Sequence, residues 1–263
     1  MNPSKTIKIA TFNANSLRAR LQIVLDWLTQ ESPDVLAIQE TKVQDHEFPL
    51  APFKEAGWNV IFRGQKSYNG VAFISKTPLT LVTDRLYPGQ EMEEARFLHC
   101  KLGEWDLVNT YIPQGFLLDS EKFQYKLKFF KDLKNYLDRN ISDKNPALWM
   151  GDLNVALTEI DLARPKENAD HVCFHVEARN AIQEVMNQFW IDLFRQKVSG
   201  PGHYTFWDYR MPSTFSKNLG WRIDYILGNV IAEKKLQKIW IDLEPRKKEK
   251  PSDHTFLSAE FSL

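Results

Sequence analysis

Residues 147–154 read Ala-Leu-Trp-Met-Gly-Asp-Leu-Asn, and this stretch decides the fold. Four consecutive apolar residues, 147–150, are typical of a strand that is buried on both faces between helices. A carboxylate at Asp152 and an amide at Asn154 follow directly. Because these two residues are two apart on an expected extended segment, we predict that their side chains point the same way from the strand end. The stretch therefore indicates an α/β protein in which a strand end carries chemically useful side chains.

Three further polar segments lie far apart in the chain, each near a strand-like run. They are Thr-Phe-Asn-Ala-Asn at 11–15, Gln-Glu-Thr at 39–41 and Ser-Asp-His at 252–254. With residues 151–154 they supply the carboxylates, amides and imidazole that a magnesium-dependent phosphodiesterase needs around one phosphate. Taken singly, each also fits an ordinary strand-end acid, an Asx turn or a helix cap. It is the combination that indicates an enzyme.

Strands and helices are expected to alternate along the chain. Strand-like runs occur at residues 7–10, 35–38, 59–62, 71–74, 98–102, 107–112 and 147–150. Helical periodicity occurs at 17–28, with Asn15 and Ser16 as the expected cap, and at 123–137 and 176–189. No Gly-, Ser- or Pro-rich linker and no fixed-period repeat divides the sequence. We expect one domain, residues 1–263, built as an α/β sandwich of two packed sheets covered by helices.

Composition limits the function less than the motifs do. The chain has 263 residues, 43% of them apolar, and its 34 basic and 34 acidic residues balance. A nucleic-acid surface must therefore be local, because no global positive field attracts a polyanion. Two cysteines, no secretory or transit segment and no run of eighteen apolar residues predict a cytoplasmic, soluble protein without a membrane partner.

The motif residues can be assigned to the parts of a phosphodiester hydrolysis. Glu40 offers a hard oxygen ligand of the kind that magnesium prefers, and Asp253 offers a second acid near the metal. Asp224, at the start of an expected strand, can orient His254 through one ring nitrogen so that the other donates to the phosphate. Tyr111, at the end of another strand, offers a phenol donor, although half-buried packing is its commoner role.

These segments together resemble the exodeoxyribonuclease III and abasic-site endonuclease family, within the endonuclease, exonuclease and phosphatase superfamily. The resemblance extends from Ile7 to Phe261. It is carried by six ordered blocks: TFNANSLR (11–18), LAIQETK (36–42), YIPQG (111–115), GDLN (151–154), GWRIDY (220–225) and SDH (252–254). It implies a four-layer, DNase I-like sandwich of two mixed sheets with helices outside and a site at one edge.

The resemblance also implies a role for each motif residue. The metal, Mg²⁺ with Mn²⁺ as a substitute, would be held by Glu40 as principal ligand, with Asn13, Asp152, Asn154 and Asp253 around it. Asp152 would either prepare the attacking water or protonate the leaving oxygen. The remaining catalytic residues are Tyr111 and Asn154 at the phosphate and Asp224 behind His254. Some relatives carry an acid where this chain has Asn15, and the number of ions, one or two, stays open.

The prediction of the substrate depends on an aromatic segment, 204–210, and on Trp221. In the family, the positions of Phe206, Trp207, Trp221 and Ile223 line a pocket for an extruded sugar without a base, and Gln114 lies near it. Such a pocket favours a nucleotide with no base to clash and little stacking to lose. The alternative is that these are ordinary core aromatics.

The loop 210–218 is expected to lie against the DNA groove, with Arg210 and Lys217 as contacts. Lys247, Lys248 and Lys250, in the charge run 246–250, could bind backbone phosphates, but a solvated face is favoured for these three lysines. His171, Cys173 and His175 alternate as on a strand face, which can suggest zinc. A packed thiol beside two polar imidazoles is the favoured interpretation.

The predicted partner is double-stranded DNA with abasic sites or blocked 3′ ends. A monomeric repair nuclease would incise the duplex 5′ to an abasic site and trim 3′ ends by 3′-5′ exonuclease action. Two alternatives come from other classes: a non-catalytic nucleic-acid-binding relative, and a superfamily phosphatase acting on small phosphorylated headgroups. The intact acids and His254 argue against the first, and the Phe206-Trp207 pair and residues 221–224 argue against the second.

Overall fold

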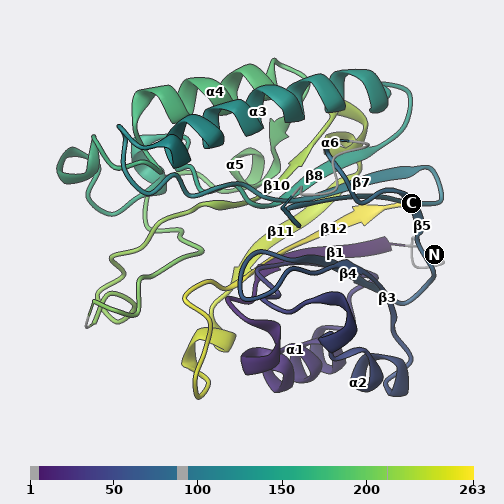
Figure 1. The fold of residues 1–263 in the computed structure, drawn as a ribbon. Helices are drawn as coiled ribbons and strands as arrows, with labels where there is room; N and C mark the ends of the chain where they lie inside the picture. Colours follow the sequence, from purple (N-terminus) through teal and green to yellow (C-terminus); the bar gives the residue numbers. More distant parts are fainter. Residues whose placement is uncertain (1–5, 88–93, 212) are drawn as a thin grey trace.

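Two six-stranded sheets packed face to face form the centre of the computed structural model, which describes residues 6–87, 94–211 and 213–263 (Figure 1). The first sheet has the order β11-β12-β1-β2-β4-β3 and the second β5-β6-β7-β8-β10-β9. The strands of the first sheet are β1 (Thr6–Asn13), β2 (Val35–Gln39), β3 (Asn59–Arg63), β4 (Val71–Ser75), β11 (Leu236–Asp242) and β12 (Phe256–Ser262). Those of the second are β5 (Thr80–Thr83), β6 (Phe97–Leu102), β7 (Trp105–Tyr111), β8 (Ala147–Asp152), β9 (Ile191–Asp192) and β10 (Asp224–Gly228).

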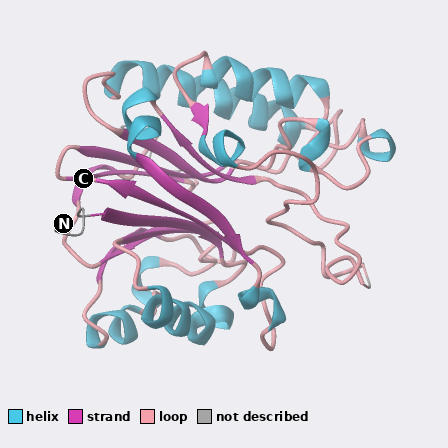
Figure 2. Ribbon diagram, turned by 180° about the vertical axis from the view of Figure 1, so that it is seen from behind, coloured by secondary structure: helices cyan, strands magenta, loops and turns pink. Residues whose placement is uncertain are grey.

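Helices cover the outer faces of both sheets, so the molecule has four layers (Figure 2). The helices are α1 (Leu17–Glu31), α2 (Leu50–Glu55), α3 (Glu121–Asn140), α4 (Val176–Met186), α5 (Leu193–Lys197) and α6 (Val230–Lys235). Helices α1 and α2 lie on the side of the first sheet, and α3 and α4 on the side of the second (Figure 1). The predicted α/β sandwich is confirmed. Within the described ranges, no helix combines the length and apolarity needed to cross a membrane.

The apolar run of β2 is buried on both faces. Val35 and Ala37 belong to the core between the two sheets, whereas Leu36 and Ile38 pack with the core beneath α1. Successive side chains of a strand point to opposite faces, so a strand between two cores requires apolar residues at every position. The same reason explains β8, where Leu148 and Met150 face the core between the sheets.

Strand directions bring the polar motifs to one end of the sandwich. Each sheet has one parallel pair near its middle, β1 with β2 and β7 with β8, so the carboxyl ends of these strands lie together. Strands β12 and β10 run antiparallel to β1 and β8, so each begins at that same end. The start of β1 and the end of β12 lie together at the opposite end, at the right of Figure 1. This arrangement gathers residues Asn13, Glu40, Tyr111, Asp152, Asp224 and His254.

Several local details differ from the sequence predictions. Ser16 occupies the cap position of α1, but its φ is 93° and its side chain makes no capping hydrogen bond. Helix α4 ends at Met186 rather than at Phe189, because Asn187 adopts a left-handed conformation with φ 35°. Strands β5 and β9 and helices α2, α5 and α6 were not predicted, since segments this short show little periodicity.

Candidate active site

Asn13 joins the two sheets at the centre of the site. Its Nδ2 donates to Glu40 Oε1 at 2.8 Å and to Asp152 Oδ2 at 2.8 Å. Asn13 ends β1, Glu40 follows β2, and Asp152 ends β8 of the other sheet. The main-chain oxygen of Asn13 also accepts from Ser252 Oγ at 2.8 Å, which anchors the Ser-Asp-His segment. One amide therefore fixes the separation of two carboxylates that approach from different layers.

The carboxylates of Glu40 and Asp152 could hold a metal ion, with His254 beside them. One ligand atom from each lies within 4.8 Å of the others. Two carboxylates are the protein ligands that magnesium commonly uses while it keeps several waters, so the donor set fits this ion. Asp253 is outside this cluster, and its Oδ1 accepts from Asn15 Nδ2 at 2.9 Å. The structure therefore brings the principal predicted ligand together with Asp152 and leaves Asp253 at the rim.

Lys42 is a site residue that the sequence did not reveal. Its Nζ lies 2.8 Å from Glu40 Oε2 and also donates to Asn15 Oδ1. Burial alone would raise the pKa of Glu40, but the Lys42 ammonium, Asn13 and His254 hold it below its usual range. Glu40 is therefore ionised, as a metal ligand must be.

His254 forms a buried pair with Asp224, as predicted. Nδ1 of His254 lies 2.8 Å from Asp224 Oδ2, and Nε2 lies 3.8 Å from Asp152 Oδ2. Burial lowers the pKa of the imidazole, but the Asp224 and Asp152 carboxylates outweigh it and raise the pKa to about 10. The ring is therefore a cation near neutral pH, with Nδ1 donating to Asp224 and Nε2 directed toward Asp152.

Asp152 is set to exchange a proton near neutral pH. Burial raises its pKa to about 7, the carboxylates of Asp224 and Glu40 act in the same direction, and the His254 cation opposes them. Tyr111, its neighbour in the β7–β8 register, has a pKa raised by burial and by the carboxylates of Glu40 and Asp152. The phenol therefore stays protonated and can donate a hydrogen bond.

Asn154 meets Asp152 by a turn rather than along an extended segment. Its φ is 49°, in the left-handed region, so the predicted extended geometry is wrong. The two side chains nevertheless touch: Asn154 Nδ2 lies 3.2 Å from Asp152 Oδ2 and donates to the Ile112 oxygen at 3.0 Å. Gly151 has φ 133°, and a Cβ there would lie 2.0 Å from the Thr110 oxygen. Only glycine fits this position.

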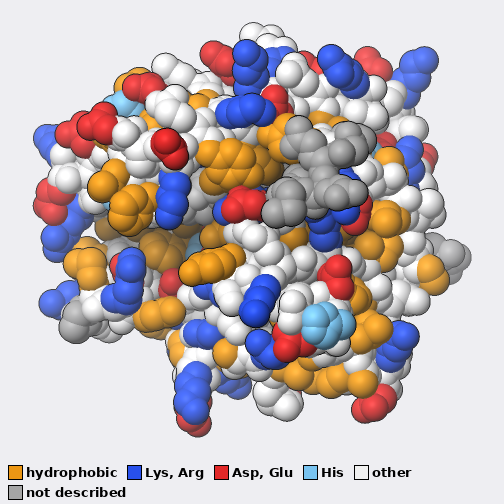
Figure 3. Space-filling view, viewed as in Figure 1, with side chains coloured by type: hydrophobic (Ala, Val, Ile, Leu, Met, Phe, Trp, Pro, Cys, Tyr) orange, Lys and Arg blue, Asp and Glu red, His pale blue; other side chains and the backbone are white. Residues whose placement is uncertain are grey.

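Above these residues lies an open cavity of about 750 Å³. In Figure 3, hydrophobic side chains gather around a hollow at the left of the molecule, on the end opposite the start of β1 and the end of β12, with lysine and arginine among them. Five residues of the predicted DNA and abasic-site set line the cavity: Gln114, Phe206, Arg210, Trp221 and Ile223. The structure therefore places an apolar wall beside the acidic cluster.

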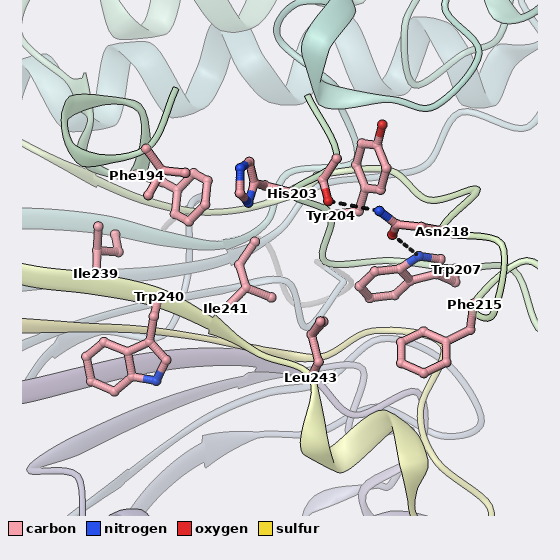
Figure 4. Close-up of a pocket in the computed structure, with 12 residues that line it drawn as sticks. Phe194, His203, Tyr204, Trp207, Phe215, Asn218, Ile239, Trp240, Ile241 and Leu243 are labelled. Carbon is pink, nitrogen blue, oxygen red and sulfur yellow. Dashed lines mark hydrogen bonds between the residues drawn. The ribbon is translucent and has the colours of Figure 1, made fainter. Parts of the chain in front are cut away.

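Trp207 does not line this cavity, contrary to its predicted place. Its side chain is 1% exposed, and Nε1 donates to Asn218 Oδ1 at 3.2 Å. The indole lies instead beside a second cavity of about 430 Å³, shown in Figure 4 with Phe215 and Leu243 nearby. Phe206 and Trp207 are adjacent in sequence, so their side chains leave the backbone in different directions and only one faces the acids.

The basic residues of the predicted DNA surface lie in different settings. Arg210 is exposed and pairs with Asp208 at 2.8 Å, and Lys217 is also exposed. Residue 212 of the same loop lies outside the described residues. Arg246, the first residue of the charge run, is buried, and its guanidinium lies over the rings of Trp207 and Phe215. Lys247, Lys248 and Lys250 are exposed.

His171, Cys173 and His175 do not share a strand face. The segment is a turn in which the amides of Phe174 and His175 both donate to the His171 oxygen. Cys173 is buried with its Sγ 3.7 Å from Asn154 Oδ1, which confirms a packed thiol. The His171 ring lies 4.8 Å from the ring of Trp221 and lines the catalytic cavity. This proximity to the site was not predicted.

Lys126 is the second site residue that sequence reasoning missed. It is 0% exposed, and its ammonium donates to the main-chain oxygens of Gln114, Asn154 and Val172 at 3.1, 2.8 and 2.8 Å. One cation therefore joins three loops around the cavity. A signal existed, because Lys126 falls on the apolar face of α3, three residues after Phe123.

Comparison with known proteins agrees with this geometry. The model of the Endonuclease/Exonuclease/phosphatase family matches residues 10–254. Exodeoxyribonuclease III of Haemophilus influenzae is 32% identical over 267 residues, which cover 97% of this chain and 100% of that protein. The family model thus includes every motif segment described above, from residue 11 to residue 254.

Two solved structures show the same architecture. An AP endonuclease from Archaeoglobus fulgidus is 40% identical with a TM-score of 0.94, covering 98% of this chain and 100% of the other. A 3′ phosphatase from Neisseria, bound to a product DNA hairpin, is 33% identical with a TM-score of 0.91 over 98% and 100%. The chain belongs to the endonuclease/exonuclease/phosphatase family, among the exodeoxyribonuclease III and AP endonuclease proteins, and is a phosphodiester-hydrolysing DNA repair nuclease.

Proposed function

We propose that this protein is a magnesium-dependent enzyme that incises double-stranded DNA 5′ to abasic sites and also trims 3′ ends, acting as a monomer of one domain. The observation that carries the proposal is the position of Glu40, Asp152 and His254 at the floor of a cavity walled by Phe206 and Trp221. The acidic cluster fits a phosphate with its cation, and the aromatic wall fits the sugar beside it.

Glu40 and Asp152 would hold the metal, supported by Asn13 and Asn154, with Asp253 contacting it through water. A bound Mg²⁺, or Mn²⁺ in its place, would neutralise charge on the phosphoryl oxygens. Asn13 and Asn154 are assigned to the metal site because they donate hydrogen bonds to the carboxylates of Glu40 and Asp152. These hydrogen bonds orient the carboxylate oxygens.

Asp152 would carry the proton transfer. With a pKa raised to about 7, it can accept a proton from the attacking water or return one to the leaving oxygen. The protonated His254, held by Asp224, and the phenol of Tyr111 would donate to the phosphoryl oxygens as negative charge develops there. These groups are already positioned by their partners, so little reorganisation is needed.

Phe206, Trp221 and Ile223 would enclose the extruded sugar of an abasic site, with Gln114 and Arg210 at the rim. The His171 ring lies 4.8 Å from the Trp221 ring and extends this wall of the cavity. A 3′-terminal nucleotide is stacked on one side only, so it can reach the acidic cluster with less unstacking than an internal nucleotide. We therefore assign 3′-end trimming as the second activity; a similar structure is that of a 3′ phosphatase.

The test is cleavage of a labelled duplex that carries one abasic analogue, beside the same duplex without the lesion and a nicked duplex with a 3′ phosphate. We expect a single cut at the lesion and removal of the 3′ phosphate, both with Mg²⁺ and neither with chelator. Asp152→Asn should bind the duplex without cutting it. Binding without cleavage by the unaltered protein, under Mg²⁺ and Mn²⁺, would contradict the proposal.

Trp221→Ala separates the two activities. Removal of the indole should reduce abasic incision more than 3′ trimming, since only the former requires the extruded sugar to be enclosed. Equal losses in both would show that Trp221 contributes packing alone.

A further inference from the structure

Phe116 is exposed and strained at the edge of the catalytic cavity. Its side chain is 62% exposed, that of Leu117 is 61% exposed, and the backbone of Phe116 has φ 61°. A left-handed conformation is costly for a bulky residue, and exposure of two adjacent large apolar side chains is costly as well. The Lys122 ammonium lies 5.2 Å from the centre of the Phe116 ring, but the side chains of Phe116 and Leu117 both remain largely exposed, so the loop is suited to binding.

The loop borders a groove of about 460 Å³ that shares the lining residue His171 with the catalytic cavity. Phe116 and Leu117 line it with His171, and His171 also lines the cavity above the acidic cluster. The amide of Phe116 donates to Gln114 Oε1 at 3.1 Å, which ties the loop to another cavity residue. A strand of DNA whose phosphate lies at Asp152 would therefore have a neighbouring nucleotide within reach of the groove.

The chemistry of the groove fits a base and not a phosphate. Among the described residues that line it, none is lysine or arginine, and two are the carboxylates Asp119 and Asp170. Carboxylates repel phosphate, but they accept hydrogen bonds from the exocyclic amino groups of bases. Aromatic and aliphatic side chains stack on the faces of bases without regard to sequence.

We infer that Phe116, Leu117 and His171 form a subsite for one unpaired nucleobase of the DNA substrate, next to the phosphate that is cleaved. This inference rests on the proposed function. It adds DNA with an unpaired nucleotide beside the cleaved phosphate as a class of substrate. A base still paired within a duplex cannot enter the groove, so ends and lesions with an unpaired neighbouring nucleotide are the preferred substrates.

The experiment uses 2-aminopurine, a fluorescent adenine analogue whose emission changes on stacking. It is placed singly at each position flanking the lesion or 3′ end, once paired and once mismatched, and bound to Asp152→Asn protein so that the DNA stays intact. In the mismatched duplex, one flanking position should change its emission on binding. Phe116→Ala in the same background should abolish that change and weaken binding of mismatched DNA about tenfold, with less than a twofold effect on paired DNA.

Two further variants control for packing. Phe116→Trp keeps an aromatic face and should restore the signal, and Leu81→Ala removes an exposed side chain of the distant strand β5 and should change nothing. Equal weakening of paired and mismatched DNA by Phe116→Ala, or an unaltered fluorescence change, would overturn the subsite. If the wild-type protein fails to cleave DNA, the proposed function itself is overturned. Failure of the subsite alone leaves cleavage by the wild-type protein intact, so the two outcomes can be told apart.

Discussion

The Nδ1 atom of His254 lies 2.8 Å from the Asp224 carboxylate, and both side chains are buried. Asp224 begins β10 of the second sheet, opposite Asp152 in the register, whereas His254 precedes β12 of the first sheet. The pair therefore holds the two sheets together at the catalytic end and fixes which nitrogen of the imidazole faces the cavity.

Asp224→Asn should lower kcat by roughly 10²- to 10⁴-fold, because the neutral amide no longer stabilises the His254 cation that donates to the phosphate. Binding of DNA should change much less, since the shape of the site is kept. Steady-state cleavage measures kcat and KM, and Asp132→Asn on α3 serves as the control. An unchanged kcat would show that the pair is structural only.

Glu40→Gln should weaken magnesium binding at least about tenfold, because the amide keeps the hydrogen bond with Asn13 but loses the ligand charge. Lys42→Met should act in the opposite direction, since it removes the ammonium 2.8 Å from Glu40 that competes with a cation. Direct titration with Mn²⁺, followed by electron paramagnetic resonance, measures both variants without relying on activity. Equal affinities in both would contradict the assignment of Glu40.

Lys126→Met should destabilise the protein by about 2–4 kcal/mol, because three buried main-chain oxygens lose their donor. Lys128→Met, two residues along α3 and largely exposed, should stay within about 0.5 kcal/mol of the wild type. Urea unfolding of the two variants measures the difference. Similar midpoints would mean that the loops around Gln114 and Asn154 do not depend on this cation.

Asp161→Asn should lower the free energy of unfolding by about 3–5 kcal/mol at pH 7, because Asp161 pairs with the buried Arg222 at 2.8 Å. Burial would raise the pKa of Asp161, but Arg222 and Arg195 outweigh it and hold the pKa below its usual range. The unfolded chain thus takes up the proton first as the pH falls.

The stability that Asp161 contributes is therefore present above about pH 4 and is lost as the pH falls through its folded pKa. The difference between wild type and Asp161→Asn should shrink below pH 4 in chemical unfolding series. A constant difference from pH 7 to pH 3 would contradict this assignment.

Long, regular elements could be predicted from sequence, because the burial of each residue in them sets whether that position is apolar or polar. The run at 35–38 predicted β2, and the leucine spacing after residue 17 predicted α1. The site motifs could be placed at strand ends because each of them follows or precedes such an apolar run. Their convergence at one end depends on strand order and direction, which the residues alone do not specify and the family resemblance supplied.

Side-chain direction in irregular segments could not be predicted. Trp207 and Phe206 belong to one aromatic segment, yet a single register position decides which faces the acids. Asn154 adopts a left-handed φ that an Asp-x-Asn pattern permits but does not require. Arg246 and Lys126 are buried because main-chain oxygens accept from them, that of Ser252 for Arg246 and that of Asn154 for Lys126, and a sequence does not reveal such acceptors.

The position of β12 in the first sheet has a consequence for biosynthesis. This strand lies between β11 and β1, and His254 immediately precedes it, so the catalytic end needs residues from both extremes of the described chain. A nascent polypeptide still on the ribosome at residue 240 has Glu40 and Asp152 but lacks both the imidazole and the strand that completes the sheet. We therefore expect a chain that stops at residue 240 to lack the proton donor at the phosphate and not to cleave DNA.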